Sequence, residues 1–154
     1  MGAVDDRLAE LGLEVPPVVP PVAAYVPAAH SGDLVWVSGQ VPVVEGKILA
    51  TGKVGAEITP EQAADLARVC ALNAIAALKA EIGDLDQVER IVKVVGFVAS
   101  APSFSGQPAV VNGASELLVA VFGEAGRHAR SAFGVSVLPL DVPVEVELVA
   151  KVRG

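Results

Sequence analysis

The chain has 154 residues, of which 53% are hydrophobic, and a formal net charge of −7 at pH 7. This length fits one domain with its own core. The negative charge disfavours the phosphate backbone of nucleic acids, because no run of Lys and Arg interleaved with aromatic residues offsets it locally. We therefore expect no nucleic-acid partner.

The start of the chain predicts a short helix over residues 4–11 followed by an extended arm. Proline fixes φ and lacks the N–H that a helix needs, and four prolines follow the helix: Pro16, Pro17, Pro20 and Pro21. We therefore divide the chain into an N-terminal helix and arm, residues 1–21, and one folded domain, residues 22–154. The acidic start is not typical of a secretion signal. We also find no apolar segment of membrane-spanning length, and we expect a cytoplasmic protein.

The first part of the domain predicts antiparallel strands. Residues 23–29 and 34–38 are expected to form two strands joined by a turn. Glu45-Gly46 predicts a hairpin turn between residues 41–44 and 47–50.

Two helices follow in the pattern. Thr59 predicts an N-cap, with Pro60 in the first turn and Gln62 closing a capping box, and the apolar helical spacing lasts until Gly83. Pro108 begins a second helix, which is expected to end near Gly123 or Gly126.

The remaining strands complete an α+β fold. Residues 90–99, 131–138 and 144–152 predict strands, with Gly96 marking a bulge or a close backbone approach. The order β-β-β-α-β-α-β-β fits a mixed sheet with two helices packed on one face. Apolar residues occupy both odd and even positions of residues 90–99, so both faces of this strand carry apolar side chains. We therefore expect the second face of the sheet to be covered as well, most simply by sister subunits.

Several classes of site are disfavoured by the sequence. Cys70 stands alone in an apolar helical stretch and is expected to be a buried, inert thiol. His30 and His128 are far apart and are expected to be surface histidines, so we predict no metal site. No Ser-His-Asp pattern, glycine-rich phosphate loop or H-E-x-x-H pattern occurs.

Arg130 is the strongest candidate for a functional residue. The stretch HARSAFGVSVLP places this cation at the start of an apolar strand, just after a helix, in a chain with more acidic than basic residues. The planar guanidinium suits a small carboxylate. The alternative is a surface arginine paired with a neighbouring glutamate.

The chain resembles the RidA/YjgF family of imine and enamine deaminases, which are also described as L-PSP endoribonucleases. The resemblance covers roughly residues 22–152 and rests on four blocks: Tyr25 in the first strand, Val37-Ser38-Gly39-Gln40-Val41-Pro42, Asn112 in the second helix, and Ala129-Arg130-Ser131 leading to Leu138-Pro139 and Glu145. It implies a chorismate-mutase-like fold and a homotrimer with a site at each subunit interface.

The resemblance also implies an activity and its residues. Arg130 would bind the substrate carboxylate, and Glu145 would orient the attacking water. The pocket would be lined by Tyr25 from the neighbouring subunit and by Ser38, Gly39, Asn112 and Ala132. The reaction would be hydrolysis of small 2-imino acids or enamines to 2-keto acids and ammonia, with no metal or organic cofactor. The spacing of Arg130 and Glu145 fits two adjacent strands joined by a turn.

Two positions depart from the pattern of the family. Ala132 stands where the well-studied deaminases often carry a cysteine, and Gly134 stands where they carry a glutamate. The second hypothesis is therefore a non-catalytic homotrimer that binds a small carboxylate or a protein partner. From the residues alone, Asn112 either makes a specific hydrogen bond or faces solvent. Glu145 either belongs to the site or shares a solvated face with Glu147.

Overall fold

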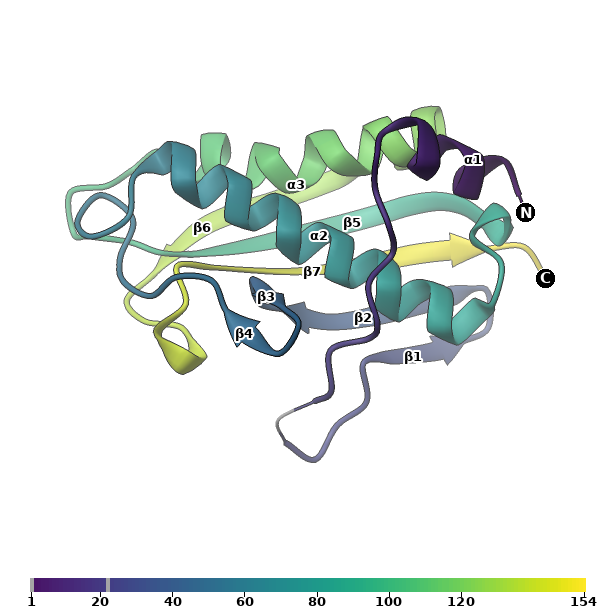
Figure 1. The fold of residues 1–154 in the computed structure, drawn as a ribbon, viewed down its shortest axis with the longest axis horizontal. Coiled ribbons are helices and arrows are strands. Elements are labelled where there is room, and N and C mark those ends of the chain that lie inside the picture. Colours follow the sequence, from purple (N-terminus) through teal and green to yellow (C-terminus); the bar gives the residue numbers. More distant parts are fainter. Residues whose placement is uncertain (1, 22) are drawn as a thin grey trace.

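The computed structural model describes residues 2–21 and 23–154, and it has a five-stranded mixed sheet with two long helices on one face (Figure 1). The strand order is β1-β2-β7-β5-β6; β5 and β6 are parallel and the other neighbours are antiparallel. The strands of this sheet are β1 (Ala28–Ser31), β2 (Leu34–Gln40), β5 (Val88–Ala99), β6 (Ala129–Val135) and β7 (Val144–Val152). The predicted α+β class is confirmed.

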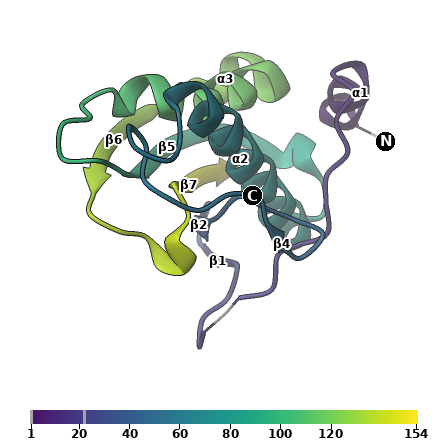
Figure 2. The ribbon, with the colours of Figure 1, turned by 60° about the vertical axis from the view of Figure 1, so that its left-hand side comes forward.

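Helices and short elements complete the fold, and Figure 2 shows α2 and α3 side by side above the sheet. The helices are α1 (Ala3–Glu10), α2 (Pro60–Ile82) and α3 (Gln107–Phe122), with 3₁₀ turns η1 (Leu85–Gln87), η2 (Gly123–Gly126) and η3 (Pro139–Asp141). A separate hairpin joins β3 (Val43–Val44) to β4 (Lys47–Ile48). Its two turn residues both have positive φ, as a type I′ turn requires.

The boundaries of α2 follow the predicted caps. The Thr59 hydroxyl accepts a hydrogen bond from the Gln62 amide at 3.1 Å, and Gln62 Oε1 accepts one from the Thr59 amide at 2.9 Å. Gly83 ends the helix with a φ of 81°, which favours glycine. Both the start and the stop of this helix are confirmed.

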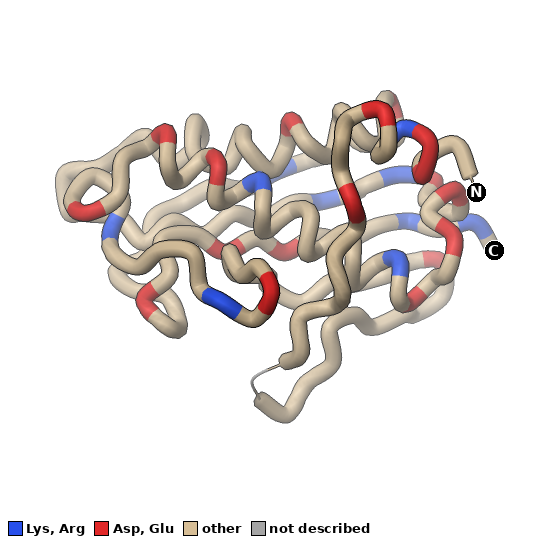
Figure 3. The backbone as a smooth tube through the Cα atoms, in the orientation of Figure 1, with Lys and Arg blue, Asp and Glu red and all other residues tan. Residues whose placement is uncertain are grey.

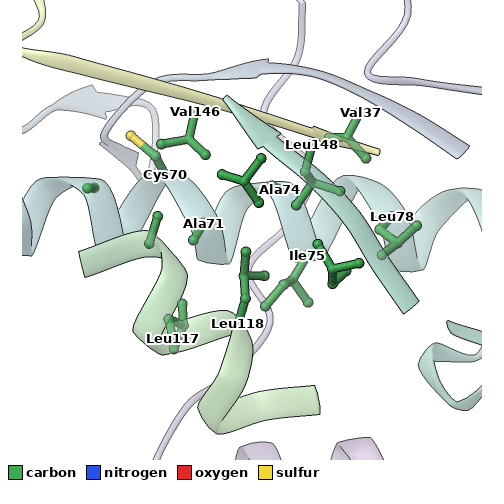
Figure 4. Close-up of a cluster of buried hydrophobic side chains, with 14 of the residues drawn as sticks. Val37, Cys70, Ala71, Ala74, Ile75, Leu78, Leu117, Leu118, Val146 and Leu148 are labelled. Carbon is green, nitrogen blue, oxygen red and sulfur yellow. The ribbon is translucent and has the colours of Figure 1, made fainter. Parts of the chain in front are cut away.

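The core lies between the two helices and the sheet (Figure 4). Cys70, Ala74 and Leu78 of α2 are fully buried there, beside side chains of α3 and of β2 and β7. The thiol of Cys70 lies 3.8 Å from the Val144 carbonyl oxygen, and burial raises its pKa well above the usual value. The predicted buried thiol is confirmed.

Close backbone approaches explain two glycines. A Cβ at Gly113 of α3 would overlap the carbonyl group of Ala64 in α2, so the helices cross with their backbones in contact. A Cβ at Gly96 of β5 would overlap the side chain of Val111. The close approach predicted for Gly96 is confirmed, while the register shifts of β5 lie earlier, between Val88 and Lys93.

The largest differences from the predicted strand boundaries are at the start of β1 and the end of β6. The chain before Ala28 is irregular, so Tyr25 precedes β1 instead of lying within it; Pro27 at this boundary has no N–H to donate to a neighbouring strand. β6 ends at Val135 rather than at residue 138, because its partner β5 ends at Ala99, which pairs with Val135.

The N-terminal helix is held against the body of the fold. The Asp86 carboxylate accepts hydrogen bonds from the amides of Ala3 and Val4, both at 2.9 Å, and these bonds keep the pKa of Asp86 below its usual value. Lys79 Nζ donates to Asp5 Oδ1 at 3.0 Å. The predicted short helix is thus confirmed, and residues 13–21 after it contain neither helix nor strand. Val22, where the predicted domain begins, lies outside the described residues.

One expectation about membrane segments is wrong. The stretch Gln107–Gly126 is long and apolar enough to cross a membrane, by length and composition only. In the fold, however, α3 packs on α2, β5 and β6. Its apolar face is buried there through Val110, Val111, Ala114, Leu117, Leu118 and Val121. The high hydropathy of this segment therefore reflects a core helix.

We predict that Gly113→Ala destabilises the protein by about 1–3 kcal/mol, because the added methyl group forces α2 and α3 apart. Equilibrium denaturation in urea measures the loss. Glu116→Ala, at an exposed position one turn later on α3, serves as the control and should change the free energy of unfolding by no more than about 0.5 kcal/mol. A Gly113→Ala protein as stable as the wild type would contradict the close helix crossing.

Candidate functional site

Helix α3 holds the guanidinium of Arg130, which projects from β6. Nη1 donates to Asn112 Oδ1 at 2.8 Å and to Ser115 Oγ at 3.3 Å, and Nη2 donates to the Pro108 carbonyl oxygen at 3.3 Å. Asn112 therefore makes a specific hydrogen bond. No ion pair forms between Arg130 and a carboxylate among residues 2–21 and 23–154, so the alternative of a surface ion pair is not what this chain shows.

The three bonds leave part of the guanidinium available. An arginine has five N–H donors, and Nε–H and one hydrogen on Nη2 have no acceptor in the described part of the chain. Nε and Nη2 lie on one edge of the planar group, where a single carboxylate can accept from both nitrogens. Arg130 is thus anchored by α3 and keeps Nε–H and one Nη2 hydrogen available as donors.

His128 extends this arrangement. Its Nδ1 lies 2.6 Å from the Gly126 carbonyl oxygen, which can only accept, so Nδ1 carries the hydrogen. Nε2 then accepts from the Ser115 hydroxyl at 2.8 Å. Burial lowers the pKa of His128, and the nearby Arg130 cation lowers it further, although the bond to Gly126 acts in the opposite direction. A neutral imidazole fits both contacts.

The Arg130 cavity is an open hollow of about 340 Å³. It is lined by Ser115, Val119, Arg127, His128 and Arg130. Two guanidinium groups and no carboxylate face this space, so it suits an anion. His128 was expected at the surface, but it is half-buried and bonded within the site.

Glu145 belongs to a second cavity, of about 270 Å³, next to the N-terminal arm. The Glu145 cavity is also lined by Tyr25, Gly39 and Gln40. Burial raises the pKa of Glu145 above its usual value, and the neighbouring Glu147 raises it further. Partial burial in a cavity distinguishes Glu145 from a residue on a fully solvated face.

A bulge in β2 shapes this second cavity. Val37 pairs with Leu148 and Gln40 pairs with Val146, so β2 has one extra residue between these pairs, at Ser38 and Gly39. A Cβ at Gly39 would lie 2.9 Å from the carboxyl carbon of Glu145. The missing side chain at Gly39 therefore makes room for the Glu145 carboxylate.

Ser38 ties the Tyr25 loop to the sheet. Its hydroxyl donates to the Val26 carbonyl oxygen at 2.7 Å, and its amide donates to the Pro27 carbonyl oxygen at 2.9 Å. These bonds fix the segment that carries Tyr25, whose side chain is 46% exposed. Ser38 thus supports the cavity wall.

The structure places the candidate residues in two groups on opposite faces of the sheet. Arg130 pairs with the buried Val94, on the helix face, whereas Glu145 pairs with Phe97, on the open face. The expectation that Arg130 and Glu145 lie on adjacent strands is wrong, because β5 runs between β6 and β7. Asn112 and Ala132 belong with Arg130; Tyr25, Ser38 and Gly39 belong with Glu145.

The space that a side chain at position 134 would enter is occupied by Gln107. A Cβ there would lie 2.8 Å from Gln107 Nε2, which donates to Ser100 Oγ at 3.2 Å and to the Phe104 carbonyl oxygen at 2.9 Å. Sequence reasoning missed Gln107, and it also missed Ser115. Ser115 follows Asn112 by three residues, a spacing that places both on one helix face and could have revealed it.

Within residues 2–21 and 23–154, no group of three or more His, Cys, Asp or Glu side chains is placed to hold a metal ion. The side chains that line the two cavities include two guanidinium groups, the Glu145 carboxylate, the Tyr25 hydroxyl and the Ser115–His128 pair.

The family model described as "YjgF/chorismate_mutase-like, putative endoribonuclease" matches residues 5–152. Protein TCP17 of Trypanosoma cruzi is 43% identical over 153 residues, which are 99% of this chain and 96% of that protein. The 2-iminobutanoate/2-iminopropanoate deaminase of Escherichia coli K12 is 34% identical over 131 residues, covering 84% of this chain and 88% of the relative.

Solved structures agree with these matches. The protein Atu1372 of Agrobacterium tumefaciens, whose function is described as unknown, is 44% identical, with a TM-score of 0.91 over 97% of this chain and 92% of that one. The yjgF gene product of E. coli is 29% identical, with a TM-score of 0.62 over 90% and 94% of the two chains. On the family match and the identities of these relatives, the chain belongs to the YjgF/chorismate mutase-like family.

Proposed function

We propose that the protein is a cofactor-free hydrolase that converts small 2-imino acids, or the related enamines, to 2-keto acids and ammonia. The observation that carries the proposal is the guanidinium of Arg130, which α3 anchors and which keeps Nε–H and one Nη2 hydrogen available for a carboxylate. The deaminase name of the E. coli relative, at 34% identity, supports the same reaction.

The complete site is formed by two copies of the chain, with Arg130 from one copy and Glu145 from the next. The opposite faces of the two groups support this arrangement. The open face of the sheet carries Trp36, 53% exposed, and Phe133, 45% exposed, which are the kind of apolar side chains that a subunit interface covers. A closed ring of three copies, each using one face on its neighbour, satisfies both requirements.

The proposed reaction needs three contributions. Nε–H and Nη2–H of Arg130 bind the substrate carboxylate and fix the position of the imine carbon. Glu145 accepts a hydrogen bond from water and takes its proton as the new C–O bond forms, while the C=N electron pair moves to nitrogen. Glu145 returns that proton to nitrogen, which gives an amino alcohol. It then takes the proton of the new hydroxyl group and passes it to the amino nitrogen, so that ammonia leaves as the C=O bond forms. The raised pKa of Glu145 makes this carboxylate a better base.

The remaining site residues have supporting roles in this proposal. Asn112 and Ser115 orient Arg130, while Ser38 and Gly39 make the recess for Glu145. The Tyr25 hydroxyl shares the Glu145 cavity and bounds the substrate. Ala132 leaves space beside Arg130 on the helix face.

Removal of the guanidinium tests the carboxylate contact. We predict that Arg130→Gln lowers kcat/KM by about 100-fold, since a charge-assisted pair of hydrogen bonds is lost. The assay measures ammonia release from 2-iminopropanoate and 2-iminobutanoate generated in place by an amino acid oxidase or a dehydratase. Arg90→Gln, on β5, is the control.

Two results would count against the enzyme. Full activity in the Arg130→Gln protein would remove the proposed role of the guanidinium. Pyruvate binding to wild-type protein without accelerated ammonia release would favour the alternative, a non-catalytic oligomer that binds small carboxylates.

Co-expression of two impaired variants tests the shared site. Arg130→Gln and Glu145→Gln are each expected to have strongly reduced activity alone. Co-expression of the two variants should restore activity at about a quarter of the sites, because some interfaces then combine an intact Arg130 with an intact Glu145. Mixing the two proteins after separate folding and assembly is the control. Absence of rescue in co-expressed, assembled protein would contradict a site formed between chains.

The pH dependence tests Glu145 as the base. Its ionised form is needed, so kcat/KM should fall as the pH drops through the Glu145 pKa, which lies above the usual 4.5. We predict that Glu147→Gln moves this acidic limb to lower pH, because a negative neighbour that raises the pKa is removed. Glu89→Gln, near Lys151 and outside the cavity, should leave the limb in place. A limb that moves to higher pH in Glu147→Gln would be the opposite of the expected effect.

A further inference from the structure

We propose that the N-terminal arm, residues 13–21, is an apolar wall of the active site and makes the enzyme prefer imino acids with aliphatic side chains. This inference rests on the proposed function, since it concerns the substrate of the same site. It concerns a segment that the reaction itself does not require.

The arm reaches the Glu145 cavity directly. Val19, Pro20 and Pro21 line this cavity together with Tyr25 and Glu145. Between Glu14 and Asp33 the chain has no Lys, Arg, Asp or Glu, and Figure 3 shows this segment without charged positions along its described length. The arm therefore offers the substrate an uncharged, apolar surface.

Another cavity, distinct from the Arg130 and Glu145 cavities, is also lined by the arm. It has a volume of about 580 Å³ and is lined by arm residues 14–20, by residues 43–46 of the β3–β4 hairpin, and by Val69, Leu72 and Asn73 of α2. Val19 and Pro20 line both cavities. Space behind these two residues allows the wall to yield when a longer side chain enters.

The arm is nevertheless held in place at its beginning. Val15 and Val18 pack against the hydrophobic core, and α1 is fixed through Asp86 and the Lys79–Asp5 pair. Proline restricts the free conformations of the arm, so little ordering is needed when a ligand arrives. Figure 1 shows the arm crossing α2 before it turns toward β1.

Physical chemistry then favours an aliphatic side chain. Each methylene buried against the arm is expected to improve binding about fourfold. A charged side chain would lose water and find no opposite charge on Val19, Pro20 or Pro21, which disfavours its entry. The substrate is thus held by its carboxylate at Arg130 and by its hydrocarbon end at the arm.

A series of imines tests this inference. An amino acid oxidase generates the imines of alanine, 2-aminobutyrate, norvaline and leucine, and kcat/KM is measured for each. For wild-type protein we expect a rise of about fourfold per added methylene. In Val19→Asp the ratio of the leucine-derived to the alanine-derived value should fall about tenfold or more, with a smaller fall in the same direction in Val19→Ala.

The control and the contrary results are equally specific. Val137→Asp introduces the same charge at an exposed valine outside both cavities and should leave the ratio unchanged. An unchanged ratio in folded Val19→Asp, or a wild-type rate independent of the side chain, would overturn the role of the arm.

A binding measurement separates this inference from the proposed reaction. Titration calorimetry compares pyruvate with 4-methyl-2-oxopentanoate, which carry the side chains of alanine and leucine. Preference for the longer keto acid in wild type, lost in Val19→Asp, supports the arm as a wall even if no imine is hydrolysed. Equal binding of the two keto acids would reject it, whether or not the protein is a deaminase.

Discussion

The alternation of side chains across the strands around β5 is the constraint from which the organisation of the site follows. β6 and β7 flank β5, and the register directs Arg130 to the helix face and Glu145 to the open face. A rotamer change cannot carry either side chain through a hydrogen-bonded sheet. Use of both residues on one substrate therefore requires two copies of the chain, and the exposed Trp36 and Phe133 lie on the face that a second copy would cover.

The same helix serves the core and the candidate site. One side of α3 buries Leu117 and Leu118, and its backbone contacts α2 at Gly113. Another side supplies Asn112 and Ser115 as acceptors for Arg130. Because the core fixes the rotation of α3 about its axis, it also fixes the direction of the guanidinium. An arginine already held by three hydrogen bonds loses little further freedom when it binds a carboxylate.

Sequence patterns predicted an element correctly where the interactions that form it join residues close together in the chain. The capping box of Thr59 and Gln62, the stop at Gly83 and the Glu45-Gly46 turn all depend on residues within one turn of each other. The position of Tyr25 depends instead on where β2 finds its partner, and the predicted first strand began too early.

Relations between distant strands could not be predicted from spacing. Glu145 follows Arg130 by fifteen positions, a separation that fits a hairpin between neighbouring strands. However, β6 pairs in parallel with β5, which leaves the opposite edge of β5 to β7. His128 shows the same limit, because its half-buried position arises from packing against Ser115 of a different element. The resemblance to a family supplied the candidate residues; only the fold could assign them to two faces.

The electrostatics of the chain need not oppose a carboxylate substrate. The net charge of −7 acts over long distances and is screened beyond about 8 Å at physiological ionic strength. The two guanidinium groups of the Arg130 cavity act at contact, and a neutral His128 fits the hydrogen-bond pattern beside them. Glu145 is separated from this cavity by the sheet within its own chain, so Arg130 is not neutralised internally by that carboxylate. In the proposed assembly, the substrate would lie between them, with its carboxylate on the cation and its imine carbon facing the base.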